Sequence, residues 1–312
     1  MKTIKLMTHV VVGYPDMEES QQLIEVLMKN SDFVELQIPF SDPVADGETI
    51  MKASETAIKN GMNTDRAFEM IYTLTSGLPR VANDVRLPRG KRNSMPSSSL
   101  SEHRHSHLFK KIQYSTKSMF NSFASGQTLR SLSRKIHVLK VHVPILIMCY
   151  YNQVFRYGVE RFIKRAKEAG VVGLIVPDIP PDEEKNEQFL SVCNKYNLDS
   201  IRVISPLSSE ERIRINSEVG KGFIYLVSHF GVTGAKSAFD KSLFEYISRV
   251  KRQTSLPLAV GFGISKREQV EALVGRADIA IVGSAIINEY DKKGIEGLKG
   301  FISHLKAGTI EK

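Results

Sequence analysis

Residues 33–61 read FVELQIPFSDPVADGETIMKASETAIKNG and predict one strand, one loop and one helix. The first seven residues are almost continuously apolar, which is typical of a parallel strand that is covered on both faces. A loop marked by Pro and Gly follows, and apolar residues then recur every three or four positions, as in a helix with one buried side. The stretch therefore predicts a β-α unit, the building block of folds with parallel sheets.

The same alternation runs through most of the chain. Strands are predicted at residues 4–13, 33–39, 144–150, 171–177, 200–206, 222–228, 257–263 and 279–284. Helices are predicted at residues 16–30, 48–61, 65–74, 158–169, 182–196, 208–218, 240–252, 265–274 and 293–306. Eight strand–helix units predict a (β/α)₈ TIM barrel, and a doubly wound parallel sheet is the alternative.

Residues 77–136 interrupt this alternation. The segment is rich in Ser, Pro, Lys and Arg and has no sustained helical or strand period. Without it, the chain is close to the ~250 residues of a bare barrel. We therefore predict one barrel domain over residues 1–312, with residues 77–136 as a disordered loop inserted between the second helix and the third strand.

The formal net charge of +9 originates in this segment. Residues 77–140 hold 13 Lys+Arg against the two acids Asp84 and Glu102, so the rest of the chain is mildly acidic. A basic chain invites a nucleic-acid partner, and the segment does interleave cations with aromatic rings. It shows no nucleic-acid-binding motif, however, so we expect no such partner. A metal tract at residues 102–107 is a minor alternative.

Composition sets further limits on the class of protein. A hydrophobic content of 42% supports a buried core, and no apolar run approaches the ~20 residues of a membrane helix. Cys149 and Cys193 are too few for a disulfide framework, and both lie in apolar stretches. We expect buried thiols and a reducing, cytoplasmic location.

Three carboxylates lie at the end of the second predicted strand or just after it, where a barrel of this class carries its chemistry. Glu35 lies inside an apolar run, where a carboxylate must be paired or must serve in acid–base catalysis. Asp42 and Asp46 lie on the following loop. They either cap the turn and the next helix or belong to the site.

Glycine-rich loops follow the last three predicted strands, at residues 231–234, 261–265 and 283–284. Bare backbone N–H groups in such loops, with a short helix at residues 285–290, form the usual phosphate site of a barrel. The sequence has no zinc-protease, P-loop or dinucleotide-binding motif. These features predict a barrel enzyme that acts on a small phosphorylated molecule and uses carboxylates, with no metal.

Four stretches, ELQIPFSDPVADG, YLVSHFGVTGAK, GFGIS and VGSAI, resemble in order and spacing the α subunit of tryptophan synthase. The resemblance covers nearly the whole chain outside the insertion. It implies a (β/α)₈ barrel that cleaves indole-3-glycerol phosphate by a retro-aldol step into indole and glyceraldehyde 3-phosphate. It also implies an α₂β₂ heterotetramer with a β subunit that holds pyridoxal phosphate, and no cofactor on this chain.

The resemblance assigns roles to particular residues. Glu35 and Asp46 match the catalytic glutamate and aspartate of the family. The phosphate-binding positions are Gly234, Gly263, Gly283 and Ser284. The indole pocket is implied at Tyr150, Tyr225 and Phe262. The loop residues near the partner or over the substrate are Pro39, Asp42 and Thr233.

Three residues depart from the family pattern. His9 stands where the family has an aromatic or apolar pocket residue, and it is either a hydrogen-bonded core histidine or a change in the pocket. Gln37 replaces a small residue, and His229 stands where arginine is frequent. Two alternatives therefore stay open: an impaired subunit that binds and activates the β subunit, and another phosphate-binding barrel lyase or isomerase.

Overall fold

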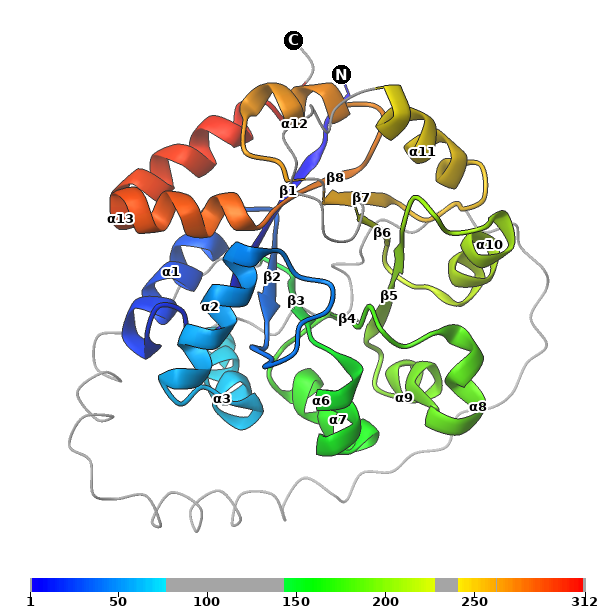
Figure 1. Ribbon diagram of the computed structural model, residues 1–312, viewed down its shortest axis with the longest axis horizontal. Coiled ribbons are helices and arrows are strands. Elements are labelled where there is room, and N and C mark those ends of the chain that lie inside the picture. Colours follow the sequence, from blue (N-terminus) through cyan, green and yellow to red (C-terminus); the bar gives the residue numbers. More distant parts are fainter. Residues whose placement is uncertain (1, 77–142, 228–240, 262, 311–312) are drawn as a thin grey trace, which may run out of the picture. The chain divides into compact units, whose positions relative to one another are not determined.

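A computed structural model of the chain describes residues 2–76, 143–227, 241–261 and 263–310. Eight parallel strands pair in chain order and close into a barrel, with β1 hydrogen-bonded to both β2 and β8. Figure 1 shows the strands in the middle and the helices around them, in the order of the sequence. The closed ring confirms the predicted TIM barrel and rules out the doubly wound sheet, which stays open.

All eight predicted strands are present, and each ends one or two residues before its predicted end, where the ladder of hydrogen bonds gives way to a loop. Their bounds are β1 (Lys5–Val11), β2 (Phe33–Gln37), β3 (Ile145–Met148), β4 (Gly173–Ile175), β5 (Asp199–Ile204), β6 (Ile224–Val227), β7 (Leu258–Gly261) and β8 (Ile279–Val282).

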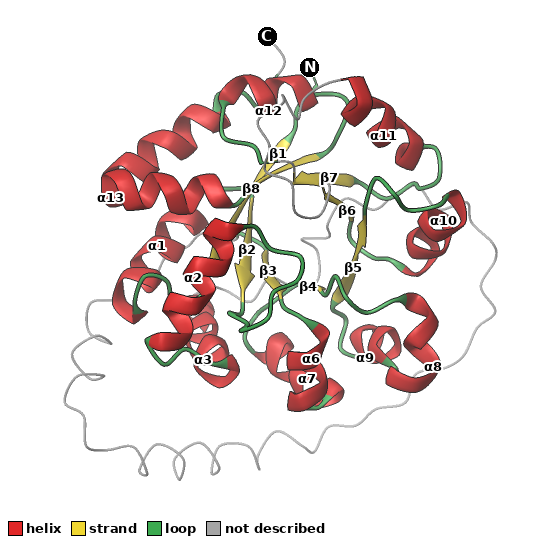
Figure 2. Ribbon diagram, viewed as in Figure 1, coloured by secondary structure: helices red, strands yellow, loops and turns green. Residues whose placement is uncertain are grey.

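The helices surround the strands, as Figure 2 shows in red around yellow. The first half of the chain has α1 (Met17–Asn30), α2 (Glu48–Lys59), α3 (Thr64–Ser76), α6 (Tyr151–Tyr157) and α7 (Val159–Glu168). The second half has η2 (Pro181–Glu183), α8 (Glu184–Glu187), α9 (Phe189–Lys195), α10 (Glu210–Val219), α11 (Lys241–Lys251), α12 (Arg267–Leu273) and α13 (Ser284–Lys306).

The helical predictions need two corrections. The single helix predicted at 182–196 is three short pieces, and Gln188 separates α8 from α9 by adopting the left-handed conformation (φ 52°). The prediction missed α6, whose short sequence YNQVFRY is rich in residues of low helix propensity. The two helices predicted at 285–290 and 293–306 are both present within α13, on either side of Gly294 (φ 63°), whose backbone is not helical.

The predicted insertion, residues 77–136, lies outside the described residues. The barrel closes without it, because β2 and β3 pair directly from Val34 with Ile145 to Gln37 with Met148. These two strands flank the segment in the sequence and are neighbours in the ring.

Asp16 caps α1. Its Oδ1 accepts the backbone N–H groups of Glu18 and Glu19, both at 2.9 Å, and so satisfies two donors that the helix itself leaves free. Leu23 and Leu27 of the same helix are fully buried against the barrel. Local capping and an apolar stripe thus act together to place α1.

The core has two parts. A large apolar layer fills the space between strands and helices, and a smaller cluster fills the barrel interior. The interior cluster consists of Met7, Phe33, Leu146, Met148, Tyr150, Ile175, Ile201, Phe223, Ala259, Ile279 and Ile281. Cys149 and Cys193 are free and buried, as predicted. Among the helices of the described residues, none has the length and apolar run that crossing a bilayer requires.

Candidate active site

The candidate site begins on β2, whose five residues FVELQ are all buried. Side chains alternate along a strand, so Phe33, Glu35 and Gln37 share one face. Phe33 belongs to the interior cluster, so this face points into the barrel. The exposed fraction is 1% for Glu35 and 0% for Gln37. The strand therefore brings a carboxyl and an amide to the carboxyl-terminal half of the barrel interior.

His9 of β1 is the cross-strand neighbour of Glu35. Its Nδ1 lies 3.2 Å from Oε1 of Glu35, and both side chains are buried. Burial by itself lowers the pKa of His9, but the charge of Glu35, a hydrogen bond to it and the charge of Asp46 outweigh burial. The pKa of His9 is consequently raised, which favours the imidazolium beside the carboxylate.

Asp46 lies on the loop between β2 and α2. Its Oδ2 accepts a hydrogen bond of 2.6 Å from Nε2 of Gln37. The prediction that Asp46 instead caps the next helix is wrong, because Gly47 is the N-cap of α2 and no side chain caps that end. Burial raises the pKa of Asp46, although the Gln37 hydrogen bond and the charge of His9 act in the opposite direction.

Two tyrosines accompany the carboxylates. Tyr150, directly after β3, is buried, and its ring stacks on Phe40 with centroids 5.2 Å apart. Its hydroxyl oxygen accepts the backbone N–H of Ala45 at 3.1 Å, which ties the β2–α2 loop to the end of β3. Burial, and then the charge of Asp46, raises the pKa of Tyr150.

Tyr225, on β6, faces the same carboxylates. Its pKa lies well above the usual value because of burial first and then the charges of Glu35 and Asp46. Gly261 at the end of β7 makes room for the ring, since an added Cβ would lie 3.1 Å from the Tyr225 hydroxyl oxygen. The structure thus brings Glu35, Asp46, Tyr150 and Tyr225 into one group.

The ends of β7 and β8 carry the remaining described glycines of the prediction. Gly283 is the N-cap of α13, and Ser284 is its first residue. The first backbone N–H groups of this helix, which have no partner within the helix, therefore lie at the carboxyl end of β8. An added Cβ on Gly283 would lie 3.5 Å from Cδ2 of His9, so this end of α13 borders the carboxylate group. Gly263 has φ +65° and open space around its Cα.

The loop residues of the prediction differ in exposure. Pro39 is buried, and its carbonyl accepts a hydrogen bond of 3.0 Å from Nε2 of Gln153. Asp42 is exposed. The predicted site residues Phe262, Thr233 and Gly234 lie outside the described residues, as does His229.

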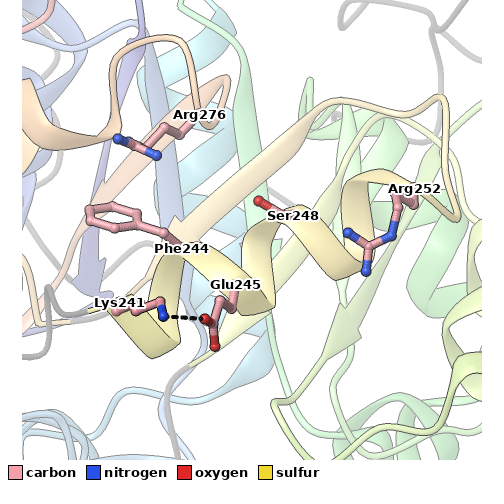
Figure 3. A pocket seen from close by; sticks show the side chains of 6 residues that line it. All are labelled: Lys241, Phe244, Glu245, Ser248, Arg252 and Arg276. Carbon is pink, nitrogen blue, oxygen red and sulfur yellow. Dashed lines mark ion pairs between the residues drawn. The ribbon is translucent and has the colours of Figure 1, made fainter.

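The surface pocket in Figure 3 is a separate feature. It lies along α11, where Lys241 pairs with Glu245 at 3.6 Å and the guanidinium of Arg276 stacks 4.2 Å from the ring centre of Phe244. None of its lining residues lies at the carboxyl end of a strand, so it is not part of the site. Within the part of the chain that the structure describes, no three His, Cys, Asp or Glu residues are grouped to hold a metal ion.

A closed eight-stranded barrel that holds the buried carboxyl group of Glu35 on β2 and a helix N-terminus at the end of β8 belongs to the class of (β/α)₈-barrel enzymes. Within that class, the sequence model of the tryptophan synthase alpha chain matches residues 1–82 and 111–307. The chain therefore belongs to the tryptophan synthase alpha chain family, whose members are lyases of tryptophan biosynthesis.

Individual relatives agree with this assignment. The tryptophan synthase alpha chain of Desulfotalea psychrophila is 34% identical over 98% of this chain and 95% of the relative. That of Methanocaldococcus jannaschii is 36% identical over 90% of this chain and 78% of the relative. A solved structure of Mycobacterium tuberculosis tryptophan synthase superimposes with a TM-score of 0.72 at 27% identity, covering 98% of this chain and 93% of the other.

Sequence reasoning found Glu35 and Asp46 but not their hydrogen-bond partners. His9 and Gln37 stood out only as departures from the family pattern. Side chains alternate between the two faces of a strand, so His9 and Glu35 can be assigned to the barrel interior once one interior residue of each strand is known. Their direct pairing depends on the register between β1 and β2, which no local pattern specifies.

Proposed function

We propose that the chain cleaves indole-3-glycerol phosphate into indole and glyceraldehyde 3-phosphate. The observation that carries this proposal is the pair of neighbouring carboxylates in a tryptophan synthase alpha chain family member, with Glu35 buried in the barrel and Asp46 on the loop that follows β2. The reaction breaks a carbon–carbon bond and needs one proton added to the indole ring and one removed from a glycerol hydroxyl. Carboxyl groups suit both transfers.

In this proposal, Glu35 gives a proton to the ring carbon that bears the glycerol chain, and the carbon–carbon bond then breaks. The same carboxylate takes the proton of the glycerol hydroxyl as the aldehyde forms, so the enzyme ends with the protons it began with. Asp46 accepts the hydrogen bond of the indole N–H and stabilises the positive charge that develops on the ring.

The surrounding residues provide the binding surfaces. Tyr150 and Tyr225 flank the carboxylates and, together with Phe262, form the proposed indole pocket. The backbone N–H groups at the start of α13 support a phosphate site at Gly283 and Ser284, to which the proposal adds Gly234 and Gly263.

The proposal includes a partner. We place this chain in an α₂β₂ complex whose β subunit holds pyridoxal phosphate and consumes the indole, with Pro39, Asp42 and Thr233 on loops near the interface or the substrate. We also propose a cytoplasmic location, which the two free, buried thiols favour.

Turnover of the full-length protein is the test of this function. With indole-3-glycerol phosphate, alone and with a β subunit of the family, we expect equal amounts of indole and glyceraldehyde 3-phosphate, measured by independent assays. A chain that speeds the β subunit's use of free indole but releases none would instead be an impaired activating subunit. Conversion of another sugar phosphate without indole release would point to a different barrel lyase or isomerase.

We further propose that residues 77–136 form an insertion outside the catalytic domain. The described strands close the barrel without this segment, and residues 83–110 within it lie outside the two ranges that the family model matches, whereas residues 77–82 and 111–136 lie inside those ranges. Replacing residues 77–136 with a short Gly/Ser linker should leave kcat/KM for indole release at the value of the full-length chain. A large loss of kcat/KM in a variant with an unchanged unfolding transition would show that the segment serves the reaction.

A further inference from the structure

We propose that His9 and Gln37 are positioning residues for the two carboxylates, with His9 holding Glu35 and Gln37 holding Asp46 by one oxygen each. The inference rests on the proposed function, since it takes these two carboxylates as the catalytic ones. It adds two residues that depart from the family pattern and contact the substrate-facing acids directly.

The strand register brings the four side chains together. His9 lies opposite Glu35 in the β1–β2 ladder, and Gln37 is two residues further along β2, on the same face. The contacts are Nδ1 of His9 to Oε1 of Glu35 at 3.2 Å and Nε2 of Gln37 to Oδ2 of Asp46 at 2.6 Å. With His9 only 7% exposed and Gln37 fully buried, neither side chain can swing into solvent.

Three atoms of the group have no hydrogen-bond partner. Buried polar atoms are normally hydrogen-bonded. Among the described residues, four buried side-chain atoms lack a partner, and three of them belong to this group: Nε2 of His9, Oε2 of Glu35 and Oε1 of Gln37. The fourth is Oγ of Ser54, on α2. One oxygen of Glu35 is thus held by His9, while the other accepts no hydrogen bond from the described residues, although Tyr225 faces this carboxyl group.

The position of His9 also links the acid to the phosphate site. Its ring lies against Gly283, at the N-terminus of α13, on one side and against Glu35 on the other. A substrate whose phosphate binds at α13 and whose ring lies over Glu35 would pass His9. We therefore expect a change at His9 to affect the geometry of the bound substrate as well as the carboxylate.

The charges of Glu35 and Asp46 favour a protonated His9 beside them. The titratable groups that face His9 are Glu35 on β2 and Asp46 on the β2–α2 loop, and Tyr225 of β6 faces both carboxylates. Both carboxylates raise the pKa of His9, and the Gln37 side chain adds to this rise. A cationic imidazole between them offsets the cost of burying negative charge in the barrel.

Kinetics of single variants test the proposal. We expect His9→Phe and Gln37→Met to lower kcat by about 10- to 100-fold with a smaller change in KM, because slight misplacement of a reacting group has effects of that size. His9→Asn should recover part of kcat, since its amide can donate to Glu35 from near the position of Nδ1.

Met7→Leu is the matched control, because Met7 lies two residues before His9 on the same face of β1 and contacts neither carboxylate through a hydrogen bond. This swap conserves volume and is well tolerated in cores. A His9→Phe or Gln37→Met variant with the kcat and KM of Met7→Leu would overturn the assignment for that residue.

Titration of His9 in the substrate-free protein tests the pair without any turnover. We expect the imidazole signal of His9, assigned by its absence in His9→Asn, to show a lower pKa in Glu35→Gln and an unchanged one in Met7→Leu. An unchanged pKa in Glu35→Gln would overturn the His9–Glu35 pair. If the wild-type chain releases no indole, the proposed function fails, and this titration still shows whether the pair exists.

Discussion

Glu35→Gln is expected to lower kcat for indole release by about 10²- to 10⁴-fold, the usual contribution of a positioned acid–base group. Gln has nearly the shape of Glu and fits the same buried place on β2, but it can neither give nor take the protons of the reaction. KM should change much less, because the proposed phosphate and ring contacts lie elsewhere. Indole and glyceraldehyde 3-phosphate, measured at saturating substrate, report the effect.

Glu271→Gln is the matched control for that experiment. Glu271 lies on α12, where its Oε1 accepts from Nε of Arg267 at 2.8 Å, and it is not part of the barrel interior. This variant should keep the wild-type kcat. Activity of Glu35→Gln within a few-fold of this control, with both proteins folded, would remove Glu35 from the acid–base role.

Asp46→Asn is the second large change, with an expected loss of about 10²- to 10³-fold in kcat, as for the removal of one preorganised charge-stabilising group. Asn preserves the size of the side chain and can still accept from Gln37, but it carries no charge to balance the one that develops on the ring. Asp65→Asn is the control, since Asp65 is exposed on α3, where its Oδ1 accepts from the Tyr157 hydroxyl at 2.6 Å. Equal activity of the two variants would contradict the role of Asp46.

Asp46→Asn should also change how activity depends on pH. Burial raises the pKa of Asp46, so its carboxylate takes up a proton at a higher pH than an exposed aspartate does. Activity that depends on the charged form should therefore fall, as pH is lowered, earlier than the ordinary aspartate value would indicate. In Asp46→Asn, this part of the acid limb should be missing from the residual activity.

Much of this arrangement could be predicted from local patterns. Apolar runs predicted all eight strands, and the helix predicted at 16–30 agrees with α1 to within one residue. The prediction failed where local signals are weak: nothing in the residues around Gln188 indicates a left-handed break, and the short α6 has low helix propensity. Tertiary packing holds such pieces in place where intrinsic propensity does not.

For the candidate site, too, local sequence indicated some features and only the structure supplied the others. The apolar surroundings of Glu35 and the Pro- and Gly-marked loop of Asp46 indicated both carboxylates, because a charge among apolar residues requires an explanation. The choice for Asp46 between capping a helix and belonging to the site depended on where its side chain points. The structure excludes the cap of α2, because Gly47 holds that position, and shows Asp46 accepting from Gln37, nine positions earlier in the chain.

The sequence by itself determined the alternation of strands and helices, the resemblance to one family and the two acids. These follow from periodicity and from residue types at short spacing, which are local properties. Only the tertiary structure decided the closure of the barrel and the partners of the acids. Closure pairs β1 with β8 across most of the chain, and the register of β1 against β2 sets His9 opposite Glu35. A shift of one residue would turn His9 away from the interior, and packing of the whole barrel prevents that shift.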